Sequence, residues 1–201
     1  MIYLASRSPR RRDLLAQIGV KFEPLLFRGG PREDPDTDES PHAGEQPDAY
    51  VRRVTTAKVQ AAWQRVVMRR GLRRMPVLAA DTTVSLAGEI LGKPADRADG
   101  ERMLRLLAGT RHRVLTAVAV AFEQRLEMAV SESEVTFAAL DDARIQAYVA
   151  SGEPHDKAGG YGIQGRAGAF VERIEGSYSG VMGLPLYETA NLLRLFGIPV
   201  P

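Results

Sequence analysis

The chain has 201 residues, of which 44% are hydrophobic, and this is enough for one large domain with a packed core. Its 27 basic and 25 acidic residues leave a net charge of only +2, which disfavours a basic face that binds nucleic acid. The absence of cysteine excludes disulfides, thiolate metal sites and a cysteine nucleophile, and the three scattered histidines disfavour a zinc site.

The N-terminal stretch predicts a strand, a tight turn and the start of a helix. Residues 2–5 form an apolar run typical of a buried strand, and apolar residues follow at helical spacing from 14 to 18. Ser8 stands at the N-cap position and Pro9 at the first helical position. A helix N-terminus behind a strand offers free N–H groups to phosphate, and Ser6, Ser8 and four nearby arginines surround it. The same pattern also fits an ordinary capped helix with a solvated basic face.

Residues 22–27 predict a second strand, followed by a polar, acidic loop rich in proline and glycine from 28 to 48. Most of this loop has the composition of a solvated segment, but Asp38 and Glu39 come just before the next helix and are able to reach a cation. Residues 48–70 predict a long amphipathic helix with Lys58 on its apolar stripe. Lys58 is either a snorkelling side chain or a cation that faces a site.

Residues 76–86 predict a buried central strand that is interrupted by Asp81. An isolated buried carboxylate is costly unless it is paired or bound to a metal, so Asp81 is the strongest candidate for chemistry. The alternative is a turn residue at the end of the strand. Ala87-Gly88 predicts a hairpin turn, and the returning residues 89–94 bring Lys93 near the level of Asp81 and Thr82.

The second half of the chain alternates strands and helices. The pattern predicts a helix over 97–108, strands over 114–122 and 128–137, a helix from a cap at Asp141 through 149, a strand over 170–174, and a last helix from Pro185 to about 196. Residues 151–168 are rich in glycine, which lets a backbone approach a ligand, but they match neither a Walker loop nor a dinucleotide fingerprint. No apolar stretch has the length of a membrane span and the first residues lack a signal-peptide layout, so we expect a cytoplasmic protein with a single domain over 1–201.

Together these features suggest cleavage of a phosphoanhydride. Clustered cations neutralise a triphosphate, carboxylates hold Mg²⁺ or Mn²⁺, and a base activates water. One rival is a nucleotide sensor or division regulator that only binds, which has no need of Asp81 as a base. Another is a nucleic-acid-binding protein that uses the arginines at 7–12 and 69–74, and the near-neutral charge and the absence of interleaved aromatic residues argue against it.

The chain resembles the Maf family of nucleoside triphosphate pyrophosphatases essentially from end to end. The motifs that carry the resemblance are, in order, Ser6-Arg7-Ser8-Pro9-Arg10-Arg11, Ala80-Asp81-Thr82, Gly92-Lys93-Pro94, Asp156-Lys157-Ala158-Gly159, Tyr161-Gly162-Ile163-Gln164-Gly165 and Val181-Met182-Gly183-Leu184-Pro185. The resemblance implies a mixed α/β fold of the Maf/Ham1-like kind, with an elongated, bent central sheet, flanking helices and two lobes around an active-site cleft. The chain departs from the family at Ala57, where Glu is common, and in its extended loop over 28–44.

The resemblance also implies hydrolysis of a nucleoside triphosphate to the monophosphate and pyrophosphate with a divalent metal cation, Mg²⁺ or Mn²⁺, as part of house-cleaning of nucleotide pools that include modified pyrimidines. Asp81 matches the family's proton acceptor, and Asp81 and Glu39 are the metal ligands that the resemblance implies. Three residues match positions associated with nucleobase choice, namely Arg10, Thr82 and Gln164. They favour the branch that acts on dTTP and UTP over the branch that acts on 7-methyl-GTP.

Polar positions around the phosphates are matched by Ser8, Arg11, Lys58 and Lys93, and Ser6 belongs to the same phosphate-binding turn. The expected partner is therefore the nucleoside triphosphate substrate. No nucleic acid and no membrane is expected as a partner, and a homodimer is left open.

Overall fold

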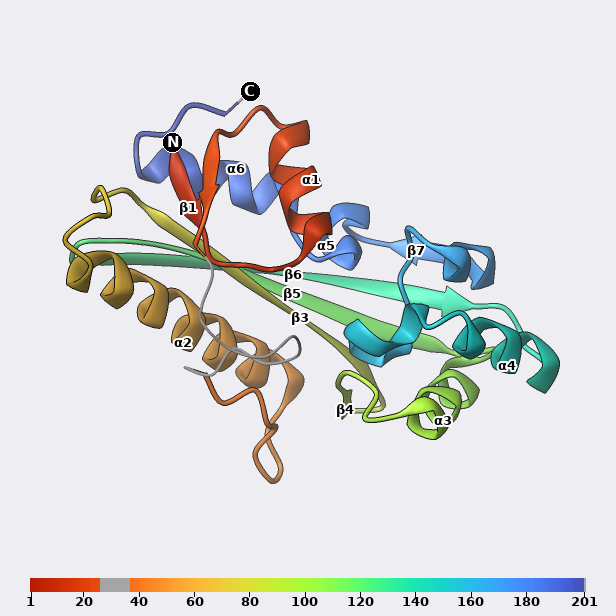
Figure 1. The fold of residues 1–201 in the computed structure, drawn as a ribbon. Coiled ribbons are helices and arrows are strands. Elements are labelled where there is room, and N and C mark those ends of the chain that lie inside the picture. The colour runs from red at the N-terminus through yellow and green to blue at the C-terminus, as the bar shows by residue number, and fades with distance from the viewer. Residues whose placement is uncertain (26–36, 201) are drawn as a thin grey trace.

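The computed structural model describes residues 1–25 and 37–200, which form an elongated α/β structure around a mixed sheet (Figure 1). The strands are β1 (Ile2–Leu4), β2 (Phe22–Pro24), β3 (Val77–Leu86), β4 (Glu89–Leu91), β5 (Arg111–Phe122), β6 (Arg125–Phe137) and β7 (Val171–Glu175). In the described chain they form a seven-stranded sheet in the order β2-β1-β3-β5-β6-β7, with β4 paired to β3 outside this path. β1 pairs in parallel with β2 and β3, and the other pairs are antiparallel. The predicted mixed α/β fold is confirmed.

Helices cover both faces of the sheet (Figure 1). The helices are α1 (Pro9–Gln17), α2 (Pro47–Met68), α3 (Arg97–Leu107), α4 (Asp142–Ala150), α5 (Tyr178–Met182) and α6 (Leu186–Leu195). α2 packs on the face that carries Val77 and Ala79 of β3, whereas α1 and α6 pack on the face that carries Leu78 and Ala80. Because side chains alternate along a strand, successive residues of β3 enter two different cores.

The strands β5 and β6 are each three residues longer at their N-terminal ends than the apolar pattern predicted. Arg111 and Arg113 extend β5 as exposed or half-buried residues, and their guanidinium groups form cross-strand ion pairs with Glu134 and Glu132 of β6. Opposite charges across a strand pair stabilise the ladder even where no apolar side chain is buried. An apolar run therefore does not mark the full length of these strands, and the polar extension of β5 includes one buried residue, His112.

The glycine-rich segment folds into three short 3-10 turns, Glu153–Asp156, Ala158–Gly160 and Arg166–Phe170. These turns pack beside α3 and α4 at one end of the sheet, over a core that includes Tyr148, Tyr161 and Phe170. The predicted helices over 48–70, 97–108 and 141–149 are confirmed to within a few residues, but α5 was not predicted. A five-residue helix is too short to show an apolar period.

Parts of two predicted elements, the end of the strand over 22–27 and the start of the loop over 28–48, lie outside the described residues. Within residues 1–25 and 37–200, no helix combines the length and the apolar character that a membrane span requires.

Candidate active site

A cleft of about 1310 Å³ opens beside the exposed edge of β3. β1 pairs with β3 only at Val77 and Leu78, and β4 joins the same strand only from Val84 onward. Between these points no described strand covers that edge, so Asp81 and Thr82 face the cleft from the gap. The cleft is lined by segments far apart in the chain, which are residues 5–11, 37–41, 80–84, 92–95, 155–158, 161–162 and 181–183, and by single residues of other elements, among them Tyr50 and Lys58.

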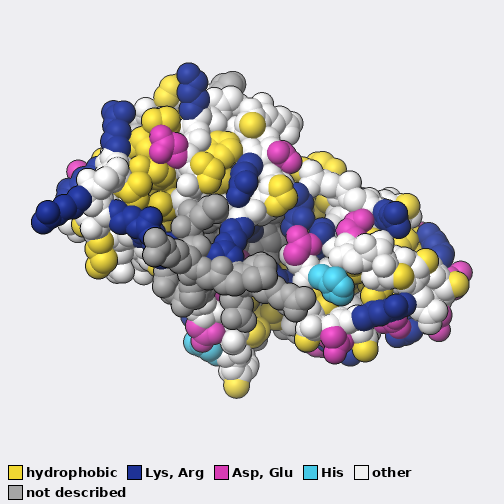
Figure 2. Space-filling model, viewed as in Figure 1, with side chains coloured by type: hydrophobic (Ala, Val, Ile, Leu, Met, Phe, Trp, Pro, Cys, Tyr) yellow, Lys and Arg dark blue, Asp and Glu magenta, His cyan; other side chains and the backbone are white. Residues whose placement is uncertain are grey.

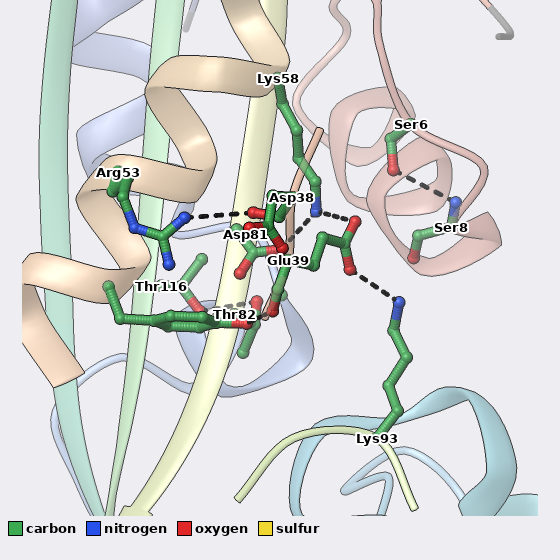
Figure 3. Close-up of polar contacts among 12 residues, drawn as sticks. Ser6, Ser8, Asp38, Glu39, Arg53, Lys58, Asp81, Thr82, Lys93 and Thr116 are labelled. Carbon is green, nitrogen blue, oxygen red and sulfur yellow. Dashed lines mark hydrogen bonds and ion pairs between the residues drawn. The ribbon is translucent and has the colours of Figure 1, made fainter. Parts of the chain in front are cut away.

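Asp81 lies in the middle of β3, not at its end, and only 9% of its surface is exposed. The Lys58 ammonium reaches it from α2 and donates to Asp81 Oδ1 at 2.6 Å (Figure 3). The same Nζ atom lies 2.7 Å from Glu39 Oε1, and Lys93 Nζ lies 3.2 Å from Glu39 Oε2. Lys58 is thus a buried cation shared by two carboxylates, and Lys93 reaches the cluster through Glu39 and not through Asp81 directly.

The charges in this cluster stabilise one another. Burial alone would lower the pKa of Lys58, but the carboxylates of Asp81 and Glu39 outweigh it and the pKa is raised. Burial would likewise raise the pKa of Glu39, but Lys58 and Lys93 outweigh it and the pKa is lowered. The Lys58 ammonium and the Glu39 carboxylate therefore both remain charged at neutral pH. On the face shown in Figure 2, several Lys and Arg side chains gather near the middle of the molecule.

The turn before α1 has the predicted capping geometry. Ser8 is the N-cap, and its Oγ atom accepts a hydrogen bond from the backbone N–H of Arg11 at 3.4 Å. Ser6 Oγ accepts from the backbone N–H of Ser8 at 3.2 Å and from Arg11 Nη1 at 3.3 Å. Arg11 also donates through Nε to the carbonyl of Gly183 at 2.7 Å and through Nη2 to Thr82 Oγ1 at 3.3 Å. The guanidinium of Arg11, whose pKa burial lowers, therefore connects α1 with β3 and the end of α5.

The direction of the Thr82 hydroxyl follows from its neighbours. Thr116 of β5 lies opposite Thr82, and their hydroxyl oxygens are 3.0 Å apart. Thr116 donates its one hydroxyl hydrogen to the carbonyl of Gly180 at 2.7 Å, because a carbonyl can only accept. Thr82 must then donate to Thr116, and since Arg11 donates to Thr82, one lone pair of Thr82 remains for a ligand. Thr116 was not predicted as a site residue, because in sequence it is one polar residue in an apolar strand.

The other two residues predicted to choose the nucleobase lie differently. Arg10 Nη1 is 3.6 Å from Asp156 Oδ2, so the side chain of Arg10 meets the opposite wall of the cleft. Gln164 is exposed and is not among the residues that line the cleft, although Gly162, two positions earlier, does line it. The structure therefore brings together Ser6, Ser8, Arg10, Arg11, Glu39, Lys58, Asp81, Thr82 and Lys93, and leaves Gln164 apart from them.

The loop that carries Gln164 is attached to the sheet through Tyr161. The Tyr161 hydroxyl lies 2.8 Å from Nε2 of His112, a buried residue of β5. Burial lowers the pKa of His112 to about 4, so this imidazole is neutral at pH 7. Gly159 has a φ of +67°, and a Cβ atom there would lie 2.9 Å from the side chain of Val84. Glycine is thus required at 159 for close packing of the loop on β3.

Comparison with known proteins places this geometry in a family. A family model described as "Maf-like protein" matches residues 1–196. A dTTP/UTP pyrophosphatase of Aromatoleum aromaticum is 56% identical over 200 residues, which are 99% of this chain and 97% of that protein. A dTTP/UTP pyrophosphatase of Ralstonia nicotianae is 59% identical over 193 residues, 96% of this chain and 92% of that protein. Among solved structures, the Ham1 protein of Staphylococcus aureus has a TM-score of 0.42 at 17% identity, covering 70% of this chain and 72% of that chain.

Proposed function

The chain belongs to the Maf-like protein family, and from this premise we propose that it hydrolyses dTTP and UTP to the nucleoside monophosphate and pyrophosphate. The observation that carries the proposal is the cluster of Asp81, Lys58 and Glu39 beside a capped helix N-terminus in one cleft. The relatives named dTTP/UTP pyrophosphatase, which are more than half identical to this chain, support the substrate class.

We assign the triphosphate to the turn before α1 and to the cations around it. Ser6 and Ser8 offer hydroxyl groups, and the start of α1 offers the backbone N–H of Arg10, because Pro9 has no N–H and that of Arg11 already donates to Ser8 Oγ. Lys58 and Lys93 offer ammonium groups from two other segments. Arg11 has five N–H donors, and its contacts with Gly183, Ser6 and Thr82 use three of them. Two N–H groups remain for phosphate oxygens, on a guanidinium whose orientation is already fixed.

We assign Asp81 as the general base. Lys58 donates to Oδ1 of Asp81, and the second oxygen, Oδ2, is the atom that we assign to the attacking water. Asp81 takes a proton from this water while the oxygen of the water bonds to the α-phosphorus. The bond from the α-phosphorus to the oxygen that bridges to the β-phosphate breaks, and pyrophosphate leaves with that oxygen.

The donor set of the cluster fits a divalent cation such as Mg²⁺ or Mn²⁺. In the described part of the chain no three His, Cys, Asp or Glu residues gather as a metal site, but oxygens of Asp81 and Glu39 converge on one cationic nitrogen, Lys58 Nζ, at 2.6 and 2.7 Å. Mg²⁺ is commonly held by one or two carboxylates together with substrate phosphates, so Asp81 and Glu39 would hold it with the nucleotide. When bound, the cation would neutralise charge on the triphosphate.

Base selection follows in part from Thr82. Its free lone pair accepts a hydrogen bond, and the N3–H group of thymine and uracil is a donor, whereas N3 of cytosine is an acceptor. A buried polar group left without a partner costs ~1–3 kcal/mol, which corresponds to roughly a ten- to hundredfold preference. Arg10 and Gln164 remain assigned to base choice on the family resemblance. The proposal includes a cytoplasmic location.

The test measures hydrolysis of dTTP, UTP, CTP, GTP and 7-methyl-GTP in the presence of Mg²⁺, Mn²⁺ or a chelator. All products are separated and identified. We expect dTTP and UTP to yield monophosphate and pyrophosphate without a diphosphate intermediate, and chelation to stop the reaction. Preference for 7-methyl-GTP would contradict the branch, and stoichiometric orthophosphate, with contaminating pyrophosphatase excluded, would contradict the reaction. Nucleotide binding without turnover would favour the non-catalytic sensor.

A further inference from the structure

Glu39 reaches the site from a segment without regular secondary structure. No helix or strand is formed between Thr37 and Gln46, and the backbone hydrogen bond found within these residues joins the N–H of Glu45 to the carbonyl of His42. The carbonyls of Asp38, Glu39 and Ser40 therefore take their partners from outside the backbone ladder. The side chains that bind these carbonyls therefore hold the segment in place.

Arg53 of α2 supplies two of the three partners. Its Nη1 atom donates to the carbonyl of Asp38 at 3.1 Å (Figure 3). Its Nη2 atom donates to the carbonyl of Ser40 at 2.9 Å. Its Nε and Nη2 atoms also form a two-point ion pair with Glu45, at 2.7 and 2.8 Å. The hydrogen bond from Arg53 contributes most to lowering the pKa of Glu45 to about 2, so the pair stays charged at neutral pH. One guanidinium thus holds the segment on both sides of Glu39 and again at Glu45.

Tyr50 supplies the third partner. Its hydroxyl donates to the carbonyl of Glu39 at 2.9 Å, and its ring lies 5.6 Å from the Arg53 guanidinium carbon. Three consecutive carbonyls are therefore bound by two side chains one turn apart on α2. Lys58, further along the same helix, then receives the Glu39 carboxylate.

We propose that Arg53 is a positioning residue for the reaction, which acts by holding the backbone at 38–40 so that the Glu39 carboxylate faces Lys58 and Lys93. The inference rests on the proposed function, in which Glu39 belongs to the metal and phosphate site. Arg53 itself donates its side-chain hydrogens to Glu45 and to two carbonyls, and it is not among the residues that line the cleft. Its effect on catalysis therefore passes through Glu39.

The test compares Arg53→Gln and Arg53→Lys with a matched control on the same helix. Arg52→Gln removes the same charge one residue away, from an exposed arginine that pairs with Asp48 within α2 at 2.9 Å. Partners that orient a metal ligand typically contribute 10- to 100-fold, so we expect Arg53→Gln to lower kcat/KM for UTP by ~10–100-fold. We expect Arg53→Lys to recover only a small part, because an ammonium lacks the planar fork, and Arg52→Gln to have wild-type kinetics.

Two further measurements distinguish a positioning role of Arg53 from a loss of structure in the whole protein. In hydrogen exchange, the amides of residues 38–45 should lose protection in Arg53→Gln, while those of β3 and β5 should not. In a double-mutant cycle, Arg53→Gln added to Glu39→Gln should cost less than threefold, because the carboxylate that Arg53 positions is already absent.

The inference would be overturned if the losses of kcat/KM in the two single variants multiplied in the double variant. Wild-type activity of Arg53→Gln, or unchanged hydrogen exchange of the amides at 38–45, would overturn it as well. Full activity of Glu39→Gln would overturn it too, because Glu39 would have no role to be positioned for. That result would leave the pyrophosphatase activity of the wild type standing. Failure of the proposed function would instead appear as a wild type that hydrolyses none of the nucleotides, and exchange at 38–45 would still decide whether Arg53 holds the segment.

Discussion

Replacement of Asp81 by asparagine isolates the proton-accepting role from the structural one. Asparagine has nearly the same size as aspartate, and its side-chain oxygen can still accept the hydrogen bond that Lys58 Nζ donates at 2.6 Å. The amide cannot take a proton from water at neutral pH. Removal of a general base typically costs ~10²–10⁴-fold, so we expect kcat for UTP to fall by that amount in Asp81→Asn.

The expected cost in stability is small by comparison. Because the Lys58 ammonium stays charged, its hydrogen bond to the asparagine oxygen is still charge-assisted and contributes ~1.5–3 kcal/mol, so the variant loses only the charge of one carboxylate. Removing one partner of a buried ion pair costs about 3–5 kcal/mol when the other charge is left unpaired, and the cost here is below that range. Lys58 is not left unpaired, because Glu39 Oε1 remains 2.7 Å from its ammonium. Domains of this size are typically stable by about 5–15 kcal/mol, so the variant should remain folded.

The assay is release of pyrophosphate at saturating UTP, with nucleotide binding by calorimetry and unfolding by urea measured on the same samples. Ser85→Ala is the control, because Ser85 lies on the same face of β3, is 1% exposed, and has a buried hydroxyl without a hydrogen-bond partner among the described residues. We expect Ser85→Ala to turn over at the wild-type rate. Asp81→Asn with more than about a tenth of wild-type kcat would refute the role of Asp81 as base.

Three other predictions concern base choice and stability, the first of them resting on the family resemblance and the other two on the structure. Gln164→Ala should lower kcat/KM for UTP more than that for CTP, and equal losses would show that Gln164 does not distinguish the two bases. Thr116→Val removes the acceptor of the Thr82 hydroxyl hydrogen, so the UTP to CTP ratio of kcat/KM should fall roughly tenfold, whereas Thr116→Ser should retain it; a ratio unchanged in both would contradict the assigned direction of the Thr82 hydroxyl. His112 has an ordinary pKa of 6.5 and a folded-state pKa of about 4, so between these values the unfolded chain binds the proton first and stability falls as pH falls. The difference between the two pKa values corresponds to about 3 kcal/mol. Between pH 6.5 and 4, the free energy of unfolding measured with urea should therefore fall by about 3 kcal/mol less in His112→Asn than in the wild type.

Sequence alone predicted the features that depend on local chemistry. The cap at Ser8, the hairpin turn at Ala87-Gly88 and the long helix with Lys58 on its buried side are all confirmed. Asp81 could be recognised because a single charge in an apolar strand needs a partner wherever that strand lies. These features require only the residues within a few positions of each other in the chain.

Tertiary structure decided which partners the charged and polar groups have. Neither the contact of Lys93 with Glu39 nor the orientation of Thr82 by Thr116 could be predicted, because each joins segments that only the folded sheet brings together. Gln164, predicted beside the base, is exposed and is not among the residues that line the cleft. The sequence around Arg53 did not indicate that its side chain binds two carbonyls and one carboxylate of the segment 38–45. A hydrogen bond depends on distances of about 3 Å and on direction, and spacing along the chain specifies neither once the partners lie on different elements.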